Sequence, residues 1–63
     1  MVTLIIGYDV ASPDVIGAYV CFFGCGCGWT DIDEDCYEFY IFSDDTDLVE
    51  AVMIKVMENF IWG

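Results

Sequence analysis

Four cysteine thiols are the side chains in this sequence best suited to bind a metal ion or to form disulfides. They are spaced Cys21-x3-Cys25-x-Cys27-x8-Cys36. Four thiolates could complete a tetrahedral zinc site, but structural zinc sites usually have two residues between the members of each ligand pair, and neither pair here does. Zinc is therefore a minority interpretation, and so is a disulfide between Cys21 and Cys36. No cofactor is predicted, and the simplest expectation is four reduced thiols.

A second candidate ion site is the acidic stretch DIDED that follows the cysteines. Asp31, Asp33 and Asp35 match the first three ligand positions of a calcium-binding loop. The match ends there, because Cys36 replaces the glycine of the sixth position and Phe42 replaces the glutamate of the twelfth. A conventional calcium loop is therefore not expected.

Catalytic chemistry has little support in this composition. The chain contains no histidine, which removes the commonest general base and the usual partner of a nucleophilic serine or cysteine. It contains no arginine either, and its single basic side chain is Lys55. Neither standard glycine-rich phosphate loop is present. The sequence therefore predicts a protein that is not an enzyme.

The composition as a whole describes one small domain, residues 1–63, with an unusual balance of charge and hydrophobicity. A domain of this size buries only about 60% of its unfolded surface, yet 59% of the residues are hydrophobic. Some apolar side chains must therefore stay on the surface, as they do in a homodimer or at a docked partner. Twelve acidic residues face one basic residue, which gives a formal net charge of −11. Self-repulsion of this kind costs stability. The net negative charge also disfavours nucleic acid and anionic membranes as direct partners, and it favours a cationic partner.

The sequence shows no basic N-terminal segment of the kind that begins a secretory signal. Its longest uncharged run, residues 15–30, contains four glycines and is shorter than the roughly 20 residues of a membrane-spanning helix. We therefore expect a cytoplasmic protein that does not enter the membrane.

The hydrophobic pattern predicts an α+β domain with a small three-stranded antiparallel sheet and one C-terminal helix packed on it. The N-terminal run MVTLIIGY has the β-branched and apolar composition of a strand. The run CYEFYIF, residues 36–42, is the clearest strand, because its side chains alternate between two faces. The core face is expected to carry Tyr37, Phe39 and Ile41, and the second face Cys36, Glu38, Tyr40 and Phe42.

The C-terminal segment is predicted to be an amphipathic helix that Ser43 or Asp44 caps. Its apolar residues recur at intervals of three and four. This stripe consists of Val49, Val52, Met53, Val56 and Phe60. Ile54 and Ile61 fall outside it, so the helix is apolar more than halfway round.

The segment before the cysteine-rich turn fits two interpretations. The composition of AYVCFF, residues 18–23, favours a strand, with one helical turn before it as an option. The alternative is a helix with Ser12, Pro13 and Asp14 as its N-cap and first two residues. Its apolar stripe would consist of Val15, Ile16, Tyr19, Val20, Phe22 and Phe23. We favour the strand, with the following CGCG as a flexible lead into a turn.

The carboxylates fall into two clusters on either side of residues 36–42. The first contains Asp31, Asp33, Glu34, Asp35 and Glu38, and the second Asp44, Asp45, Asp47 and Glu50. A strand of that length, at about 3.3 Å per residue, would separate them by roughly 20–25 Å. Alternate aspartates of an extended chain lie about 6.6 Å apart, or about two charge steps of a DNA strand. Solvated loops and helix starts also favour acidic residues, but that alternative leaves the uncompensated charge unexplained. We therefore expect both clusters to bind a partner, with Trp29, Tyr40 and Phe42 as apolar anchors.

The acidic stretches DIDEDCYE and SDDTDLVE, in a chain this small and hydrophobic, resemble phage-encoded DNA-mimic inhibitors. That group includes inhibitors of uracil-DNA glycosylase, antirestriction proteins and anti-CRISPR proteins. The resemblance covers the whole chain in size and charge and rests on no motif. It implies an inhibitor in the host cytoplasm that blocks the basic DNA-binding channel of a nucleic-acid enzyme, for which a CRISPR effector complex is a reasonable target.

Two other interpretations stay open. The first is a small structural or assembly protein that forms an obligate oligomer through its surplus of apolar surface, including Ile54 and Ile61. The second is a zinc module that uses all four cysteines.

Overall fold

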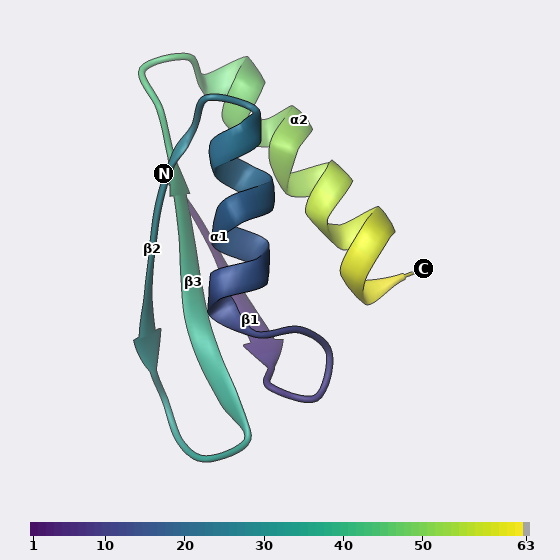
Figure 1. Ribbon diagram of the computed structural model, residues 1–63. Helices are drawn as coiled ribbons and strands as arrows, with labels where there is room; N and C mark the ends of the chain where they lie inside the picture. The colour runs from purple at the N-terminus through teal and green to yellow at the C-terminus, as the bar shows by residue number, and fades with distance from the viewer. Residues whose placement is uncertain (63) are drawn as a thin grey trace.

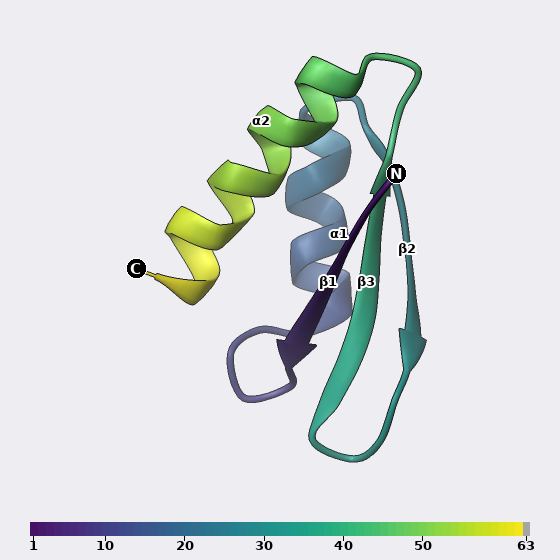
Figure 2. The same ribbon diagram turned by 180° about the vertical axis from the view of Figure 1, so that it is seen from behind.

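The computed structural model describes residues 1–62 as a three-stranded sheet with two helices on one face. The elements follow in the order β1 (Val2–Gly7), α1 (Pro13–Phe22), β2 (Gly26–Asp31), β3 (Cys36–Phe42) and α2 (Thr46–Val56). A π-helical segment over Met57–Ile61 continues α2. The sheet has the order β1-β3-β2, and both of its strand pairs are antiparallel. Figures 1 and 2 show both helices on the same side of the sheet. The predicted α+β fold, with a three-stranded antiparallel sheet and a C-terminal helix on it, is confirmed.

The side chains of the central strand β3 alternate between the two faces of the sheet as predicted. One face packs on the helices and forms the core, and the other, called the free face below, carries no helix within residues 1–62 (Figures 1 and 2). Tyr37, Phe39 and Ile41 are fully buried toward the helices. The Tyr37 hydroxyl donates a hydrogen bond of 2.8 Å to the Ala11 carbonyl, which ties the core to the β1–α1 loop. Burial raises the pKa of the Tyr37 hydroxyl. The other elements contribute Ile6, Ile16, Val20, Cys25, Val49, Val52 and Val56 to the same core.

The first helix, α1, occupies the segment for which we favoured a strand, so that prediction is wrong and the helical alternative holds. Ser12 is the N-cap, since its Oγ accepts a hydrogen bond from the Val15 N–H at 3.4 Å. Pro13 stands in the first turn, where its missing N–H costs nothing. Ile16 and Val20 lie one turn apart and are fully buried. The cap and this spacing outweigh the β composition of AYVCFF.

The third strand is β2, which forms in the glycine-rich stretch expected to be a flexible turn. Gly26 and Gly28 pair in register with Phe42 and Tyr40 of β3. The Phe42 ring lies over Gly26, where a Cβ atom would overlap with it, and the Tyr40 ring lies 3.7 Å from the place of a Gly28 Cβ. Aromatic rings that cover glycines on a neighbouring strand compensate for the low strand propensity of glycine. Packing across the strands therefore explains why this sequence is extended.

The C-terminal helix α2 has the predicted apolar stripe but a different cap. Val49, Val52 and Val56 are buried, and Met53 and Phe60 pack against the core. Ile54 and Ile61 are exposed, as their places outside the stripe indicate. The N-cap is Asp45, one residue after Asp44 and two after Ser43, the two predicted caps. Within residues 1–62, neither helix combines the length and apolar character that crossing a bilayer requires.

Candidate partner-binding surface

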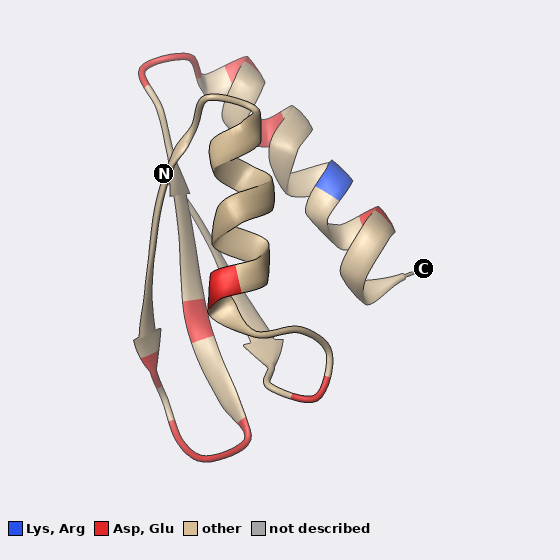
Figure 3. Ribbon diagram, viewed as in Figure 1, with Lys and Arg blue, Asp and Glu red and all other residues tan. Residues whose placement is uncertain are grey.

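Most acidic residues lie at two opposite ends of the sheet (Figure 3). One group lies at the β2–β3 hairpin, where β3 begins, and the other lies at the β3–α2 loop and the first turns of α2. Because β3 has 7 residues, at about 3.3 Å each the two groups lie roughly 20–25 Å apart. The structure thus places the two predicted clusters at the ends of one strand, except for Glu38, which lies within β3.

The first group, the hairpin end, consists of Asp9, Asp31, Asp33, Glu34 and Asp35, which are all exposed. Asp9 belongs to the β1–α1 loop. A backbone hydrogen bond of 2.9 Å, from the Tyr8 N–H to the Asp35 carbonyl, connects this loop to the hairpin. Tyr8, Asp9, Glu34 and Asp35 line an open depression of about 510 Å³. The sequence reasoning missed Asp9, because only the pairing of β1 with β3 brings it beside the hairpin.

One member of the hairpin end, Asp33, holds the turn together. Its Oδ1 accepts hydrogen bonds from the Asp35 N–H at 2.7 Å and the Cys36 N–H at 3.1 Å. These two bonds stabilise the charged carboxylate and lower the pKa of Asp33. Residues 33–35 form a bend, so the predicted extended ladder of aspartates about 6.6 Å apart does not form. The other carboxylates of the hairpin end accept no hydrogen bond of this kind.

The second group, the helix end, consists of Asp44, Asp45, Asp47 and Glu50, which are also all exposed. Asp45 caps α2, since its Oδ1 accepts a hydrogen bond from the Leu48 N–H at 3.2 Å. The Asp45 N–H in turn donates to the Ser43 Oγ at 3.2 Å. Asp47 lies in the first helical turn, where the helix dipole favours negative charge. Two of the four carboxylates therefore have a local role in starting the helix.

The free face of the sheet joins the two ends through Glu38, Tyr40 and Phe42 of β3. The Tyr40 hydroxyl donates to Glu38 Oε1 at 2.6 Å and lies 3.1 Å from Thr30 Oγ1. Ile5 of β1 is opposite Glu38 in the register and is 59% exposed. The face is thus aromatic and apolar, with one carboxylate that Tyr40 holds in place.

The third predicted anchor, Trp29, does not belong to this face. It pairs in register with Phe39, whose side chain points into the core, so Trp29 lies on the helix side of the sheet. Its ring contacts Tyr37 edge-on, with 5.9 Å between the centroids. The structure therefore brings Tyr40 and Phe42 together and separates them from Trp29. The sequence could not reveal this, because the register of β2 was not predicted.

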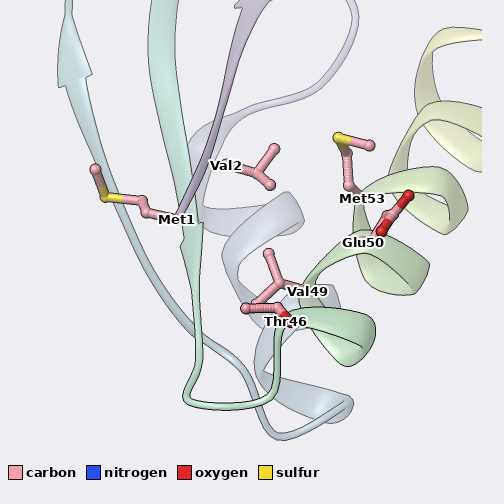
Figure 4. Close-up of a pocket in the computed structure, with 6 residues that line it drawn as sticks. All are labelled: Met1, Val2, Thr46, Val49, Glu50 and Met53. Atoms are coloured by element: carbon pink, nitrogen blue, oxygen red, sulfur yellow. The ribbon is translucent and has the colours of Figure 1, made fainter.

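An apolar groove lies beside the helix end, between the start of β1 and α2. Met1, Val2, Thr46, Val49, Glu50 and Met53 line its volume of about 370 Å³. Figure 4 shows Val2, Val49 and Met53 converging on this space, with the Glu50 carboxylate beside Met53. A groove with aliphatic walls and a carboxylate at its rim matches the two parts of a lysine or arginine side chain.

The four cysteines do not assemble into one site. Cys25 is buried in the core and Cys36 lies on the free face, opposite Gly7. The thiols in contact are Cys21 and Cys27, with 3.8 Å between their Sγ atoms. The minority interpretation of a disulfide between Cys21 and Cys36 therefore has no geometric support. Among residues 1–62, no three cysteine, aspartate or glutamate side chains are arranged to hold a metal ion, which leaves the four-cysteine zinc site and the calcium loop without geometric support.

Comparisons of this chain with protein-family models, with curated proteins and with solved structures find no match. The resemblance to DNA-mimic inhibitors therefore stays a prediction from size and charge. What the chain offers chemically is a surface with two exposed acidic ends, an aromatic face between them and a groove beside one of them.

Proposed function

We propose that this protein inhibits a nucleic-acid-binding protein by occupying its basic channel. The observation that carries the proposal is the placement of nine carboxylates at the two ends of β3, held roughly 20–25 Å apart by a strand that is itself anchored in the core. This separation corresponds to about six or seven charge steps along a DNA strand. A channel lined by lysine and arginine for a duplex would meet negative charge at both ends of the inhibitor.

The shape of the charged surface supports a protein partner over a free cation. The carboxylates are spread over three loops, the end of β2 and the start of α2, and within residues 1–62 no three of them are arranged to hold one ion. A basic protein surface can follow them, because lysine and arginine side chains reach different points independently. The groove beside Glu50 would receive the aliphatic stem of one such side chain while its charged head pairs with the carboxylate.

The free face supplies the contact that charge alone does not provide. Exposed ion pairs contribute only about 0.2–1 kcal/mol each. Tyr40 and Phe42 add aromatic surface along β3 between the acidic ends, nearer the helix end, and aromatic residues often dominate the energy of an interface. In this arrangement the charges of the two ends speed association with the partner, and the aromatic contacts of the free face slow dissociation.

The partner class follows from this chemistry. We propose a cytoplasmic enzyme or complex that holds duplex nucleic acid in a positive channel, with an RNA-guided CRISPR effector as the first target to test. If the chain is phage-encoded, it acts in the cytoplasm of the host cell. The protein itself does not bind nucleic acid, because its charge has the same sign.

Recovery of the partner is the first experiment. The immobilised protein is incubated with host lysate with and without nuclease, and a nucleic-acid-processing complex should be retained in both cases. Its affinity is then measured between roughly 50 and 300 mM salt, where we expect a loss of at least about tenfold. Duplex DNA should compete for the same site. An affinity that hardly changes over this range, or a complex that holds DNA and inhibitor together, would contradict charge mimicry.

Exposed apolar side chains favour a second candidate function, an obligate oligomer. Phe22 is 84% exposed, Trp62 66%, and Ile54 and Ile61 each more than 40%. This alternative predicts that thermal stability rises with protein concentration. It also predicts that Ile54→Ser and Ile61→Ser abolish association while reversal of acidic residues does not. Sedimentation over a range of concentrations distinguishes the two functions.

A further inference from the structure

Two thiols from different elements meet on the helix side of the sheet. Cys21 lies in the last full turn of α1 and Cys27 lies in β2, and their Sγ atoms are 3.8 Å apart. The Cys27 thiol also points toward the Gly17 carbonyl, at 3.8 Å. Gly17 and Cys21 are one helical turn apart, so the same face of α1 presents both to Cys27. The contact thus results from how α1 packs on β2.

The two remaining cysteines provide an internal comparison. Cys25 is 4% exposed and belongs to the core cluster. The Cys36 thiol is on the opposite face of the sheet, 3.7 Å from the Asp33 carboxylate. Cys21 is exposed, while Cys27 is half-buried beneath the helix. One thiol of the contacting pair is therefore open to a reagent in solution, and the second stands directly behind it.

We propose that Cys21 and Cys27 form a dithiol site that a small-molecule disulfide, such as oxidised glutathione, converts to an intramolecular disulfide. In the first step the Cys21 thiolate attacks one sulfur of the reagent, the reagent S–S bond breaks, and one thiol leaves. In the second step the Cys27 thiolate attacks the Cys21 Sγ and releases the second thiol. The two cysteines together lose two electrons and two protons, and the reagent becomes two thiols.

Little movement is needed to form this bond. A disulfide has an S–S length of about 2.0 Å, so the sulfur atoms must approach from 3.8 Å by roughly 1.8 Å. The connecting segment includes Gly24, whose φ of 85° marks the end of α1, and Gly26 at the start of β2. Neither position carries a side chain that would restrict the adjustment.

The bond would fasten an edge strand to the helix that covers it. β2 pairs only with β3, and much of its length is the glycine-containing stretch under the Phe42 and Tyr40 rings. A covalent link to α1 restricts the unfolded chain, and we expect it to raise the melting temperature by roughly 5–15 °C. The site lies on the helix side of the sheet, on the opposite face from Tyr40 and Phe42, so oxidation should leave partner binding within about twofold.

The test uses the full chain, reduced and then exposed to oxidised glutathione. After oxidation, an alkylating reagent should label two of the 4 cysteines, because the other two are held in the disulfide. Chymotryptic cleavage after Phe22 or Phe23 should leave two peptides joined by the Cys21–Cys27 bond. Cys36→Ser should oxidise like the wild type, whereas Cys21→Ser and Cys27→Ser should stop at a glutathione adduct or not react.

Each other result decides against the proposal. A bond between any other pair, a disulfide-linked dimer, or adducts without ring closure in the wild type would overturn it. So would equal closure in Cys21→Ser and Cys27→Ser. The melting temperatures of the reduced variants, compared with the reduced wild type, establish that each variant is folded before oxidation begins.

Discussion

The hairpin end and the helix end carry similar numbers of carboxylates on two different kinds of backbone. At the helix end Asp45 caps α2 and Asp47 lies in its first turn, so the needs of a helix N-terminus explain half of the group. At the hairpin end only Asp33 has such a local role. Asp9, Glu34 and Asp35 line one depression, and within residues 1–62 neither they nor Asp31 accept a hydrogen bond like those of Asp33. Because fewer of its carboxylates have a local role, the hairpin end supports the proposal of a cationic partner more strongly than the helix end does.

The largest expected effect is a difference between the two ends in how much charge reversal weakens affinity for the partner. Glu34→Lys/Asp35→Lys at the hairpin end should weaken affinity for the partner by about 100-fold, because each reversal replaces an attraction with a repulsion. Asp44→Lys/Glu50→Lys at the helix end should cost about tenfold, since fewer unengaged carboxylates surround it. Titration calorimetry at low salt measures both.

The matched control for these reversals is Glu58→Lys, which makes the same kind of charge change on the π-helical segment, outside both ends. It should weaken binding less than threefold. Asp33 and Asp45 are left unchanged in all of these variants, because their loss would disturb the turn and the cap. Glu58→Lys is one reversal and each of the other variants is two, so losses of binding free energy in proportion to the number of reversals would mean that total charge matters and the two ends do not.

The next effect lies within the helix end and concerns stability. Asp45→Ala removes the acceptor of the Leu48 N–H and should lower the free energy of unfolding by about 1 kcal/mol. The melting temperature should fall by roughly 4–8 °C. Asp44→Ala, one residue earlier, should cause no loss. Thermal unfolding followed by circular dichroism compares the pair, and a matching loss in Asp44→Ala would move the cap to that residue.

A smaller effect should have opposite signs at the two ends. Glu34→Gln/Asp35→Asn removes repulsion at the hairpin end and should raise the melting temperature by about 2 °C. Asp47→Asn removes a charge that the helix dipole favours and should lower it by a similar amount. Both changes should shrink in about 1 M salt, where charges are screened within a few ångströms. The same sign at both ends would show that general repulsion outweighs the helix dipole.

The smallest effect is the titration of Asp33. Its pKa is lowered from the ordinary value of 3.8 in the folded protein by two backbone hydrogen bonds. The stabilisation is therefore present above the unfolded pKa and is lost as the pH falls through the folded pKa. Asp33→Asn keeps an oxygen acceptor without titrating. The difference in the free energy of unfolding between the wild type and this variant should be largest near neutral pH and should vanish in strong acid. A difference that does not change with pH would mean that the charge of Asp33 does not stabilise the fold.

Several parts of this fold follow from the sequence because a local pattern determines them. The alternation Tyr37, Phe39, Ile41 identifies the core face of β3, and the intervals of three and four identify the buried side of α2. The acidic clusters follow as well, since they flank these two elements. In each case the residues that decide the structure are close together in the chain.

The parts that were missed depend on partners distant in the sequence. Gly26 and Gly28 form a strand because Phe42 and Tyr40 lie over them, and nothing in GCGCG itself indicates this. Once β2 was missed, the face of Trp29 could not be assigned. For residues 18–23 the β composition of AYVCFF favours a strand, whereas the Ser12 cap and the burial of Ile16 and Val20 decide for a helix.

The central place of β3 has a consequence for how the protein is made. β1 pairs only with β3, with Val2 opposite Ile41. A ribosome that adds about 5–20 residues per second needs roughly 2–8 s to pass from one to the other. The segment VTLIIG is therefore synthesised before the strand with which it pairs. A chaperone or an aggregating neighbour can meet β1 before the sheet closes.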